Sequence, residues 1–483
     1  MRVFENCEPK NVFYWFEEIC NIPHGSGNMD AISDYLVKFA KDRKLEVVQD
    51  HAKNVIIKKP ASVGCENAET VMLQGHMDMV AVQDADCDID MEKEPLRIAV
   101  DGDYVYAKGT SLGGDDGIAV AYALAILDDD SLVHPPLEIL ITTEEETGMD
   151  GAIGVDMNQF VAKKLINLDS EEEGILWAGC AGGMRIKVQL PVKRELTQGY
   201  EISLQVTGLL GGHSGGEIHK ERANANVVLG RILAQASQKN KMQLLSMEGG
   251  TKDNAIAIES IARVLVDEKE KDILLKEIER IEKELQHEYA TKDPDLKVIV
   301  KELGVVRKEA VTVEDSTKIA NMIFALPYGV QAMSADVAGL VETSLNLGIM
   351  KLETENMDVL YSLRSSVKSS KYALCDKVEA IVQAFGGIVE VGGEYPAWEF
   401  RKDSPLRNSM VKVYEQMYQK TPEVAAIHAG LECGLFSEKK PDLDCVSIGP
   451  NMCDIHTTSE KLSISSTERV WKYLLAVLEE LSR

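Results

Sequence analysis

The sequence has no run of about 18 apolar residues, the length that a membrane-spanning helix needs, so no membrane span is expected. Its first ten residues lack the apolar core of a signal peptide, which argues against secretion. The nine cysteines are scattered and contain no Cys-x-x-Cys pair, which excludes a disulfide framework and a thiolate zinc site. Reduced thiols of this kind fit a cytoplasmic protein.

Positive charge is also scarce. The chain has 52 Lys and Arg against 79 Asp and Glu, a net charge of −27, which argues against a nucleic-acid partner. Its 483 residues are too many for one ordinary core, so two or three domains are expected. A hydrophobic content of 45% and a charged content of 27% are typical of a globular protein.

Both ends of the chain alternate between short apolar strands and amphipathic helices. This alternation predicts an α/β domain whose mostly parallel sheet is covered by helices. The middle of the chain has strands of alternating polarity and helices of 3.6-residue period, which predict an inserted α+β domain with two similar halves. The expected parts are a catalytic domain in two pieces, 1–183 and 397–483, and the insert, 184–396.

Histidine and acidic residues follow several of the expected strands. His76 and Asp78 come after the apolar run that begins at Val71, and side chains two apart on extended backbone point the same way. Other acids close the strands near residues 139–143 and 165–168, and in open α/β sheets ligands collect at the carboxyl ends of strands. Together with the glycine-rich turn at 109–117 and His456, these motifs indicate a metal site for hydrolysis.

A pair of zinc ions needs one bridging carboxylate and, for each ion, one imidazole and one further carboxylate. The motifs supply this set in His76, Asp115, Glu146, Asp169 and His456. Glu145 is left beside a ligand without a metal of its own, where a general base belongs. Imidazole and carboxylate ligands suit Zn²⁺, and Co²⁺ or Mn²⁺ as substitutes, so two Zn²⁺ per chain are expected.

The whole chain resembles the aminoacylhistidine dipeptidases, which are also called Xaa-His or bacterial carnosinase-like cytosolic dipeptidases and belong to the two-zinc exopeptidase superfamily. The motifs that carry the resemblance are Ile22–Asn28, His76–Val80, Leu112–Gly117, Glu144–Met149, Asn167–Glu171, Gly211–Gly216, Gly430–Gly434 and Ile455–Glu460.

The resemblance implies a role for each metal ligand. His76 and Asp169 would bind one zinc, Glu146 and His456 the other, and Asp115 would bridge the two. The family also has a cis peptide bond after the bridging aspartate, here between Asp115 and Asp116.

The remaining roles follow from the same resemblance. Asp78 would orient His76 through a hydrogen bond. Glu145 would take a proton from the zinc-bridging water and deliver it to the leaving amine. The insert is similar to the family's lid, on which His213 would approach the scissile carbonyl while Asn254 and Arg364 contact the substrate carboxylate. Family members commonly form homodimers through this lid.

The leading hypothesis is therefore a dipeptidase that hydrolyses Xaa-His and related dipeptides, including β-alanyl-histidine. A tripeptide aminopeptidase or an N-acyl amino acid hydrolase of the same superfamily is the alternative within the enzyme class. A catalytically silent metal-binding or adhesive protein is a third hypothesis. The presence of Glu145 argues against it, because a site that only binds metal needs no base.

Overall fold

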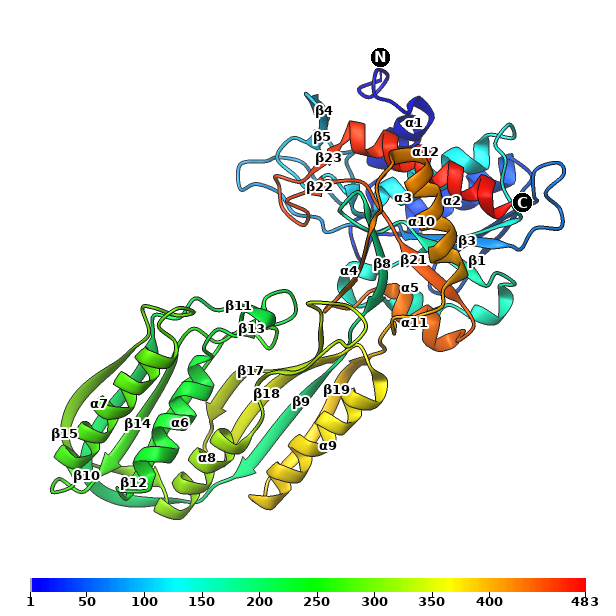
Figure 1. Ribbon diagram of the computed structural model, residues 1–483. Coiled ribbons are helices and arrows are strands. Elements are labelled where there is room, and N and C mark those ends of the chain that lie inside the picture. Colours follow the sequence, from blue (N-terminus) through cyan, green and yellow to red (C-terminus); the bar gives the residue numbers. More distant parts are fainter. Residues whose placement is uncertain (1) are drawn as a thin grey trace. The chain divides into compact units, whose positions relative to one another are not determined.

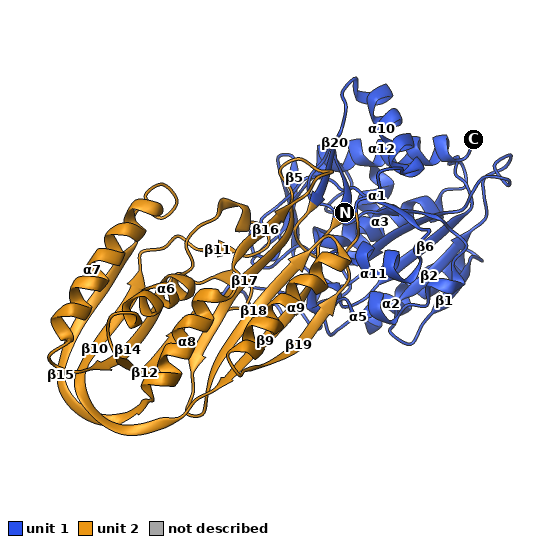
Figure 2. Ribbon diagram, turned by 60° about the horizontal axis from the view of Figure 1, so that its bottom comes forward, with its two compact units in different colours: residues 1–179, 400–426, 431–483 blue, residues 180–399, 427–430 orange. Residues whose placement is uncertain are grey.

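The computed structural model describes residues 2–483, which form two units (Figures 1 and 2). Unit 1 consists of residues 1–179, 400–426 and 431–483, and unit 2 of residues 180–399 and 427–430. Both ends of the chain thus contribute to one unit. Residues 180–183, 397–399 and 427–430, which the sequence analysis placed with the catalytic domain, group with unit 2.

Unit 1 is built on an eight-stranded sheet. Its strands, in spatial order, are β1 (Glu46–Gln49), β2 (Val55–Lys59), β6 (Leu137–Thr142), β3 (Val71–His76), β7 (Lys164–Asn167), β21 (Asp444–Ser447), β8 (Ile175–Cys180) and β20 (Glu423–Ile427). The central strands β6, β3, β7 and β21 pair in parallel. The sheet is mixed, because β1 and β2 on one side and β8 on the other pair antiparallel.

Helices cover both faces of this sheet, as expected for an α/β domain. They are α1 (Lys10–Cys20), α2 (Asp30–Asp42), α3 (Gly114–Asp128), α4 (Glu145–Gly148), α5 (Asp150–Gly154), α10 (Pro405–Tyr418), α11 (Glu432–Lys439) and α12 (Ile464–Leu481), with a 3₁₀ turn at Met157–Gln159. Figure 1 shows α5 and α11 on the side away from α1 and α3. Nearly every residue of α3 is buried, which matches its continuous apolar sequence.

A four-stranded antiparallel sheet completes unit 1, and its order is β22 (Met452–Cys453), β23 (Lys461–Ser463), β5 (Tyr104–Ala107) and β4 (Ile98–Asp101). The sequence analysis did not anticipate this sheet, because its strands have only two to four residues. The turn between β22 and β23 carries His456, so this hairpin fixes where the histidine lies.

Unit 2 contains a nine-stranded sheet. Its strands, in order, are β15 (Lys297–Val311), β10 (Arg194–Thr207), β14 (Ser260–Val266), β12 (Met242–Gly249), β17 (Val341–Leu352), β18 (Asn356–Ser365), β9 (Gly182–Pro191) and β19 (Ile388–Tyr395), with β16 (Gly329–Met333) paired to β17. Its helices are α6 (Ala225–Ser237), α7 (Lys271–Glu288), α8 (Val313–Ala325) and α9 (Lys368–Ala384). A short pair, β11 (Gly212–His213) and β13 (Ala255–Ile256), and the 3₁₀ turn Ile218–Lys220 complete it.

The two expected halves of unit 2 meet where β12 pairs with β17. Outward from this seam, β14, β10 and β15 lie on one side, and β18, β9 and β19 lie in the corresponding order on the other. β9 therefore completes the second half although it precedes the first half in the sequence. Each unit has its own cluster of buried apolar side chains, as two separately packed cores require.

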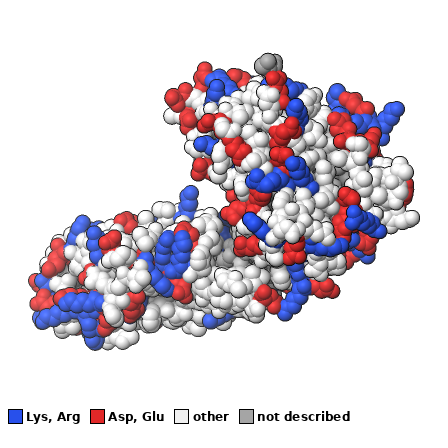
Figure 3. Space-filling model, turned by 45° about the horizontal axis from the view of Figure 1, so that its top comes forward, with Lys and Arg blue, Asp and Glu red and all other residues white. Residues whose placement is uncertain are grey.

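On the face drawn in Figure 3, acidic and basic side chains are interspersed over both units. The net charge of −27 is therefore not gathered into one acidic field on that face. Among residues 2–483, no helix combines the length and the apolar character of a membrane span.

Candidate active site

Four of the expected site residues follow neighbouring parallel strands of unit 1. β3 ends at His76, β6 is followed by Glu145 and Glu146 in α4, and β7 is followed by Asp169. β6, β3 and β7 pair side by side in parallel. Their carboxyl ends consequently meet at one edge of the sheet, which brings the four side chains into one place.

Asp115 lies between the two histidines of the set. Its Oδ1 is 3.2 Å from Nε2 of His76, and its Oδ2 is 3.2 Å from Nε2 of His456. The backbone at Asp115 departs from helical geometry within α3, with φ −83° and ψ 104°, and the peptide bond to Asp116 is cis, as the resemblance implied. A carboxylate that faces one imidazole with each oxygen has the arrangement of a bridging metal ligand.

Each histidine also faces a second carboxylate. Oε1 of Glu146 is 2.9 Å from Nε2 of His456, and Oδ1 of Asp169 is 3.6 Å from Nε2 of His76. Three groups have ligand atoms within 4.8 Å of one another, close enough to hold a metal ion: Asp115, Glu146 and His456; His76, Asp116 and Asp169; and His76, Glu145 and Glu146.

Asp116 belongs to this region although the sequence analysis gave it no role. Its side chain is fully buried, and its Oδ2 accepts the backbone N–H of His76 at 3.1 Å. Burial raises the pKa of Asp116 well above its usual range. The hydrogen bond to the backbone of His76 makes Asp116 a support for the end of β3.

Asp78 connects His76 with Glu145. The main-chain carbonyl of Asp78 lies 2.9 Å from Nδ1 of His76, whereas its carboxylate is 3.6 Å from the same atom. The carboxylate instead accepts the backbone N–H of Glu145 at 3.1 Å and the hydroxyl of Ser26 at 2.8 Å. The residue therefore orients the imidazole through its backbone and the start of α4 through its side chain.

The pKa values show how much negative charge is concentrated here. Hydrogen bonds to Asp115 and Glu146 raise the pKa of His456 to about 10. Although burial acts in the opposite direction, Asp169 and Asp115 raise the pKa of His76 well above its usual range. Burial also raises the pKa of Asp169 to about 6 and that of Glu145 well above its usual range.

The donor set fits a pair of divalent cations. Three carboxylates, those of Asp115, Glu146 and Asp169, converge with the imidazoles of His76 and His456. These carboxylates favour the protonated form of both rings. A metal ion takes the place of such protons, because imidazole coordinates in its neutral form. Nitrogen and oxygen donors without thiolate suit Zn²⁺, Co²⁺ or Mn²⁺.

A buried polar network lies beneath these residues and was not anticipated. Glu432, at the start of α11, accepts hydrogen bonds from Gln74 at 2.5 Å and Thr142 at 2.8 Å, while Asn167 donates to Gln74 at 2.6 Å. Burial raises the pKa of Glu432 to about 7. Gln74 and Asn167 each stand two residues before a site residue, and this spacing is the signal from which sequence analysis could have found them.

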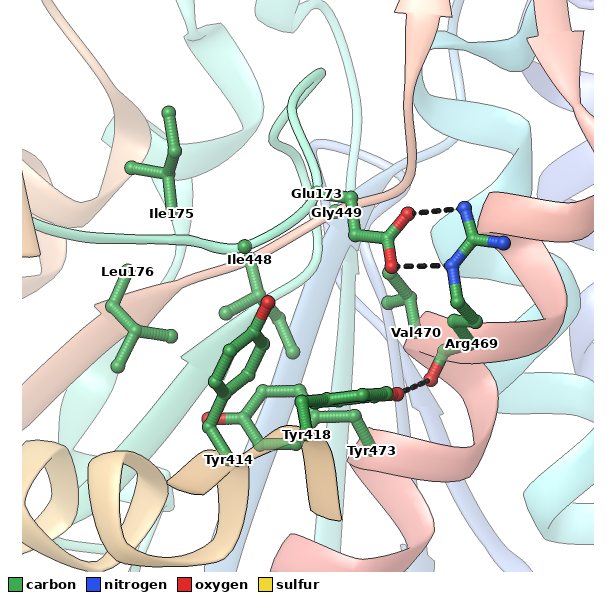
Figure 4. A pocket seen from close by; sticks show the side chains of 11 residues that line it. Glu173, Ile175, Leu176, Tyr414, Tyr418, Ile448, Gly449, Arg469, Val470 and Tyr473 are labelled. Carbon is green, nitrogen blue, oxygen red and sulfur yellow. Dashed lines mark hydrogen bonds and ion pairs between the residues drawn. The ribbon is translucent and has the colours of Figure 1, made fainter. Parts of the chain in front are cut away.

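The loop after Asp169 is tied to α12. Glu173 accepts two hydrogen bonds from Arg469, at 2.6 and 2.7 Å, and the Tyr418 hydroxyl donates to the Arg469 carbonyl at 2.9 Å. Figure 4 shows this ion pair at the border of a small pocket lined by three tyrosines and aliphatic side chains. The apolar wall lacks groups suited to chemistry, so the pocket is best understood as packing behind the loop.

In unit 2, His213 lies at the end of β11. Its Nδ1 accepts the backbone N–H groups of Gly215 at 3.2 Å and Gly216 at 3.1 Å. Partial desolvation and the nearby Arg364 lower the pKa of His213, so the ring is neutral near pH 7. A neutral imidazole that accepts at Nδ1 carries its proton on Nε2, which is then available as a donor.

Arg364 and Asn254 also lie in unit 2. The Asn254 carbonyl accepts the N–H of Ser214 at 2.8 Å, next to His213. Arg364 is buried and donates to the Tyr395 hydroxyl at 2.9 Å. Burial and Arg364 lower the pKa of His428, which received no role from the sequence, to about 3. A buried guanidinium beside neutral imidazoles suits an anionic ligand.

Comparison with known proteins places the chain in a family. The model of peptidase family M20/M25/M40 matches residues 72–480. The cytosol non-specific dipeptidase of Escherichia coli (strain K12) is 37% identical over 483 residues, which cover 100% of this chain and 99% of the relative. The aminoacylhistidine dipeptidase of Vibrio alginolyticus has a similar structure, with a TM-score of 0.95 and 35% identity over 99% of this chain and 97% of that chain.

The aminopeptidase PepT of Bacillus cereus ATCC 10987 shares the fold at 16% identity, with a TM-score of 0.57 over 99% of this chain and 100% of that chain. The resemblance inferred from the motifs is thus confirmed by full-length matches in both sequence and structure. The family match over residues 72–480 and the shared fold show that the chain belongs to peptidase family M20/M25/M40.

Proposed function

We propose that the protein is a metal-dependent dipeptidase that hydrolyses Xaa-His and related dipeptides, including β-alanyl-histidine. The observation that carries the proposal is the position of Asp115, whose two oxygens each lie 3.2 Å from an imidazole nitrogen of a different histidine. The dipeptidase names of two full-length relatives support the choice of substrate class.

The five ligands would be His76, Asp115, Glu146, Asp169 and His456, holding two Zn²⁺ ions with Co²⁺ or Mn²⁺ as substitutes. Asp115 is proposed as the bridge, with His76 and Asp169 on one ion and Glu146 and His456 on the other. The contact of 2.9 Å between Glu146 and His456 supports this pairing.

Bound metal would supply a water that is acidic near neutral pH and would polarise the scissile carbonyl. Glu145 accepts a proton from the attacking water and passes it to the leaving amine. Its backbone N–H donates to the Asp78 carboxylate, which fixes the start of α4 beside the proposed ligands. Desolvation raises the pKa of Glu145, which makes its carboxylate a stronger acceptor for the proton of the water.

Residues of unit 2 would bind the substrate. His213 donates its Nε2–H to the carbonyl oxygen of the scissile bond, where negative charge develops. Arg364 and Asn254 contact the substrate carboxylate, and the buried guanidinium of Arg364 provides the positive charge for it. Hinges near residues 182–183 and 394–396 would let unit 2 move during the catalytic cycle.

We further infer that the protein works in the cytoplasm, as the name of the Escherichia coli relative suggests, and forms a homodimer through unit 2. Its partners are small dipeptides, with no nucleic acid and no membrane.

The test is the release of free histidine from β-alanyl-histidine and from Leu-His, before and after dialysis against a chelator. We expect metal-free protein to be inactive and Zn²⁺, Co²⁺ or Mn²⁺ to restore the rate. The Asp115→Ala variant should lose both ions, because the substitution removes the ligand that the two ions share. Full activity without metal, or no histidine release from either dipeptide, would overturn the proposal.

A further inference from the structure

The side chain of Glu460 receives an unusual number of backbone hydrogen bonds. Its Oε2 accepts the N–H groups of Leu112 at 2.7 Å and Gly113 at 3.0 Å, and its Oε1 accepts those of Gly114 at 2.8 Å and Asp115 at 3.3 Å. The side chain is buried, with 3% of its surface exposed, so it contacts neither solvent nor substrate.

These four N–H groups are consecutive and run from Leu112, two residues before α3, to Asp115, the second residue of the helix. Gly113 precedes the helix in the left-handed conformation, φ 70°, and provides no side chain to cap it. Unpaired N–H groups at a helix N-terminus form a natural anion site. The carboxylate of Glu460 occupies that site in place of a local cap, although Glu460 lies 345 residues after Asp115 in the sequence.

Glu460 also stands four residues after His456. Its own backbone is fixed because β23 begins at the next residue and pairs with both β22 and β5. One carboxylate thus joins the segment that carries His456 to the segment that carries Asp115. In the site, Nε2 of His456 lies 3.2 Å from Oδ2 of Asp115.

We propose that Glu460 is a positioning residue for the metal centre, and that its carboxylate sets the position of Asp115 relative to His456. The proposal deepens the proposed function, because it assumes that these residues bind metal. Gln at this position keeps the size but replaces one acceptor oxygen by an NH₂ group, which faces N–H donors and cannot accept from them. The start of α3 would then shift and weaken both metal sites through the shared ligand.

The experiment titrates metal-free protein with Co²⁺ alone, followed by visible absorption and by competition with a chromophoric chelator. We expect Glu460→Gln to bind Co²⁺ about 10–100-fold more weakly than the wild type, the usual loss when a group that orients a ligand is removed. We also expect a changed Co²⁺ spectrum, which a loss of global stability alone would not produce.

Glu138→Gln is the matched control. Glu138 is equally buried and accepts backbone N–H groups of Val161 and Ala162, at 3.1 and 3.0 Å, but contacts no expected ligand. Both variants should lose stability, as measured by denaturant unfolding of the metal-free proteins, whereas only Glu460→Gln should lose Co²⁺ affinity. Affinity within twofold of the wild type in Glu460→Gln, or an equal loss in Glu138→Gln, would overturn the proposal.

If Glu460→Gln does not fold, Glu460→Asp decides the question. It keeps the charge but withdraws the carboxylate by one methylene, so we expect weakened Co²⁺ binding; wild-type affinity would show that Glu460 serves folding only. Failure of the proposed function looks different, because the wild-type protein itself would then bind no Co²⁺.

Discussion

Glu145 and Glu146 are neighbours in the chain, yet the structure gives them different surroundings. The side chain of Glu146 reaches His456 at 2.9 Å, whereas the backbone of Glu145 is fixed by the Asp78 carboxylate. Ligand atoms of both glutamates and of His76 lie within 4.8 Å of one another, so the contact with His456 is what distinguishes Glu146 from Glu145. At the scale of the residue, the contacts of a side chain decide its role as much as its residue type does.

This difference leads to a paired prediction. Glu145→Gln should keep both metal ions and lose turnover by at least about 10²–10⁴-fold, the usual contribution of general acid–base catalysis. Glu146→Gln should instead lose metal from one site. Metal content and rate are measured for both variants; equal metal loss in the two, or an active Glu145→Gln, would contradict the division of roles.

His213 provides a second prediction. Because its Nδ1 accepts two backbone N–H groups, the proton lies on Nε2 and can be donated to substrate. His213→Ala should therefore lower kcat strongly and leave metal content unchanged. His219→Ala, on an exposed histidine of the same region, is the control. A fall in metal content parallel to the fall in rate would mean that His213 is a ligand or a structural residue.

At the scale of elements, α7 shows how a helix over the unit 2 sheet is stabilised. Leu274, Ile278, Ile281 and Leu285 are buried on one face, as their spacing predicted. Glu277 lies at the border of this face and receives hydrogen bonds from Lys239 at 2.8 Å and Arg280 at 2.6 Å. These two cations stabilise the charged carboxylate as well as the helix.

The pH dependence of this pair can be tested. Hydrogen bonds from Arg280 and Lys239 lower the pKa of Glu277 from 4.5 to about 2. A lowered carboxyl pKa stabilises the folded state above the unfolded value, and the effect disappears as the pH falls through the folded value. Glu277→Gln should thus destabilise unit 2 by up to about 1 kcal/mol at pH 7, since both partners are partly exposed, and by progressively less below pH ~4.5.

The measurement is denaturant unfolding of wild type and variant at pH 7, 4 and 3. Glu279→Gln is the matched control on the same helix, because its pair with Lys283 is well exposed and contributes little. A difference between wild type and Glu277→Gln that stays constant down to pH 3 would contradict the assigned cause.

At the scale of the whole molecule, the proposed metal ligands and the proposed substrate-binding residues lie in different units. Each has its own apolar core, and all five proposed metal ligands belong to unit 1. His213, Asn254 and Arg364 belong to unit 2. Ligand binding stabilises only the folded part that contains the site.

Calorimetry should therefore resolve two unfolding transitions that respond differently to metal. Zn²⁺ at 1,000 times its dissociation constant should increase the free energy of unfolding of unit 1 by about 4 kcal/mol. The midpoint temperature of the unit 1 transition should rise accordingly. The unit 2 transition, identified by its shift in Glu277→Gln, should stay where it is. Equal shifts of both transitions on chelation would show that the units unfold together.

The sequence alone determined the features that depend on local pattern and on strand ends. His76, Glu145, Glu146 and Asp169 were expected together because parallel strands end at one edge of a sheet, and the structure places them there. Apolar spacing likewise predicted α7, and the two halves of unit 2 followed from repeated element types.

Only the tertiary structure decided which distant segments meet. Three features join residues that are far apart in sequence. They are the hydrogen bonds of Glu460 to the start of α3, the place of β9 in the second half of unit 2, and the Glu432 network beneath the site. The local periodicity of apolar residues does not predict such contacts, because they form only when complete helices and strands pack together. The position of Asp115 between two histidines was implied by the family resemblance, but its geometry also depends on tertiary packing, since His456 comes from the other end of the chain.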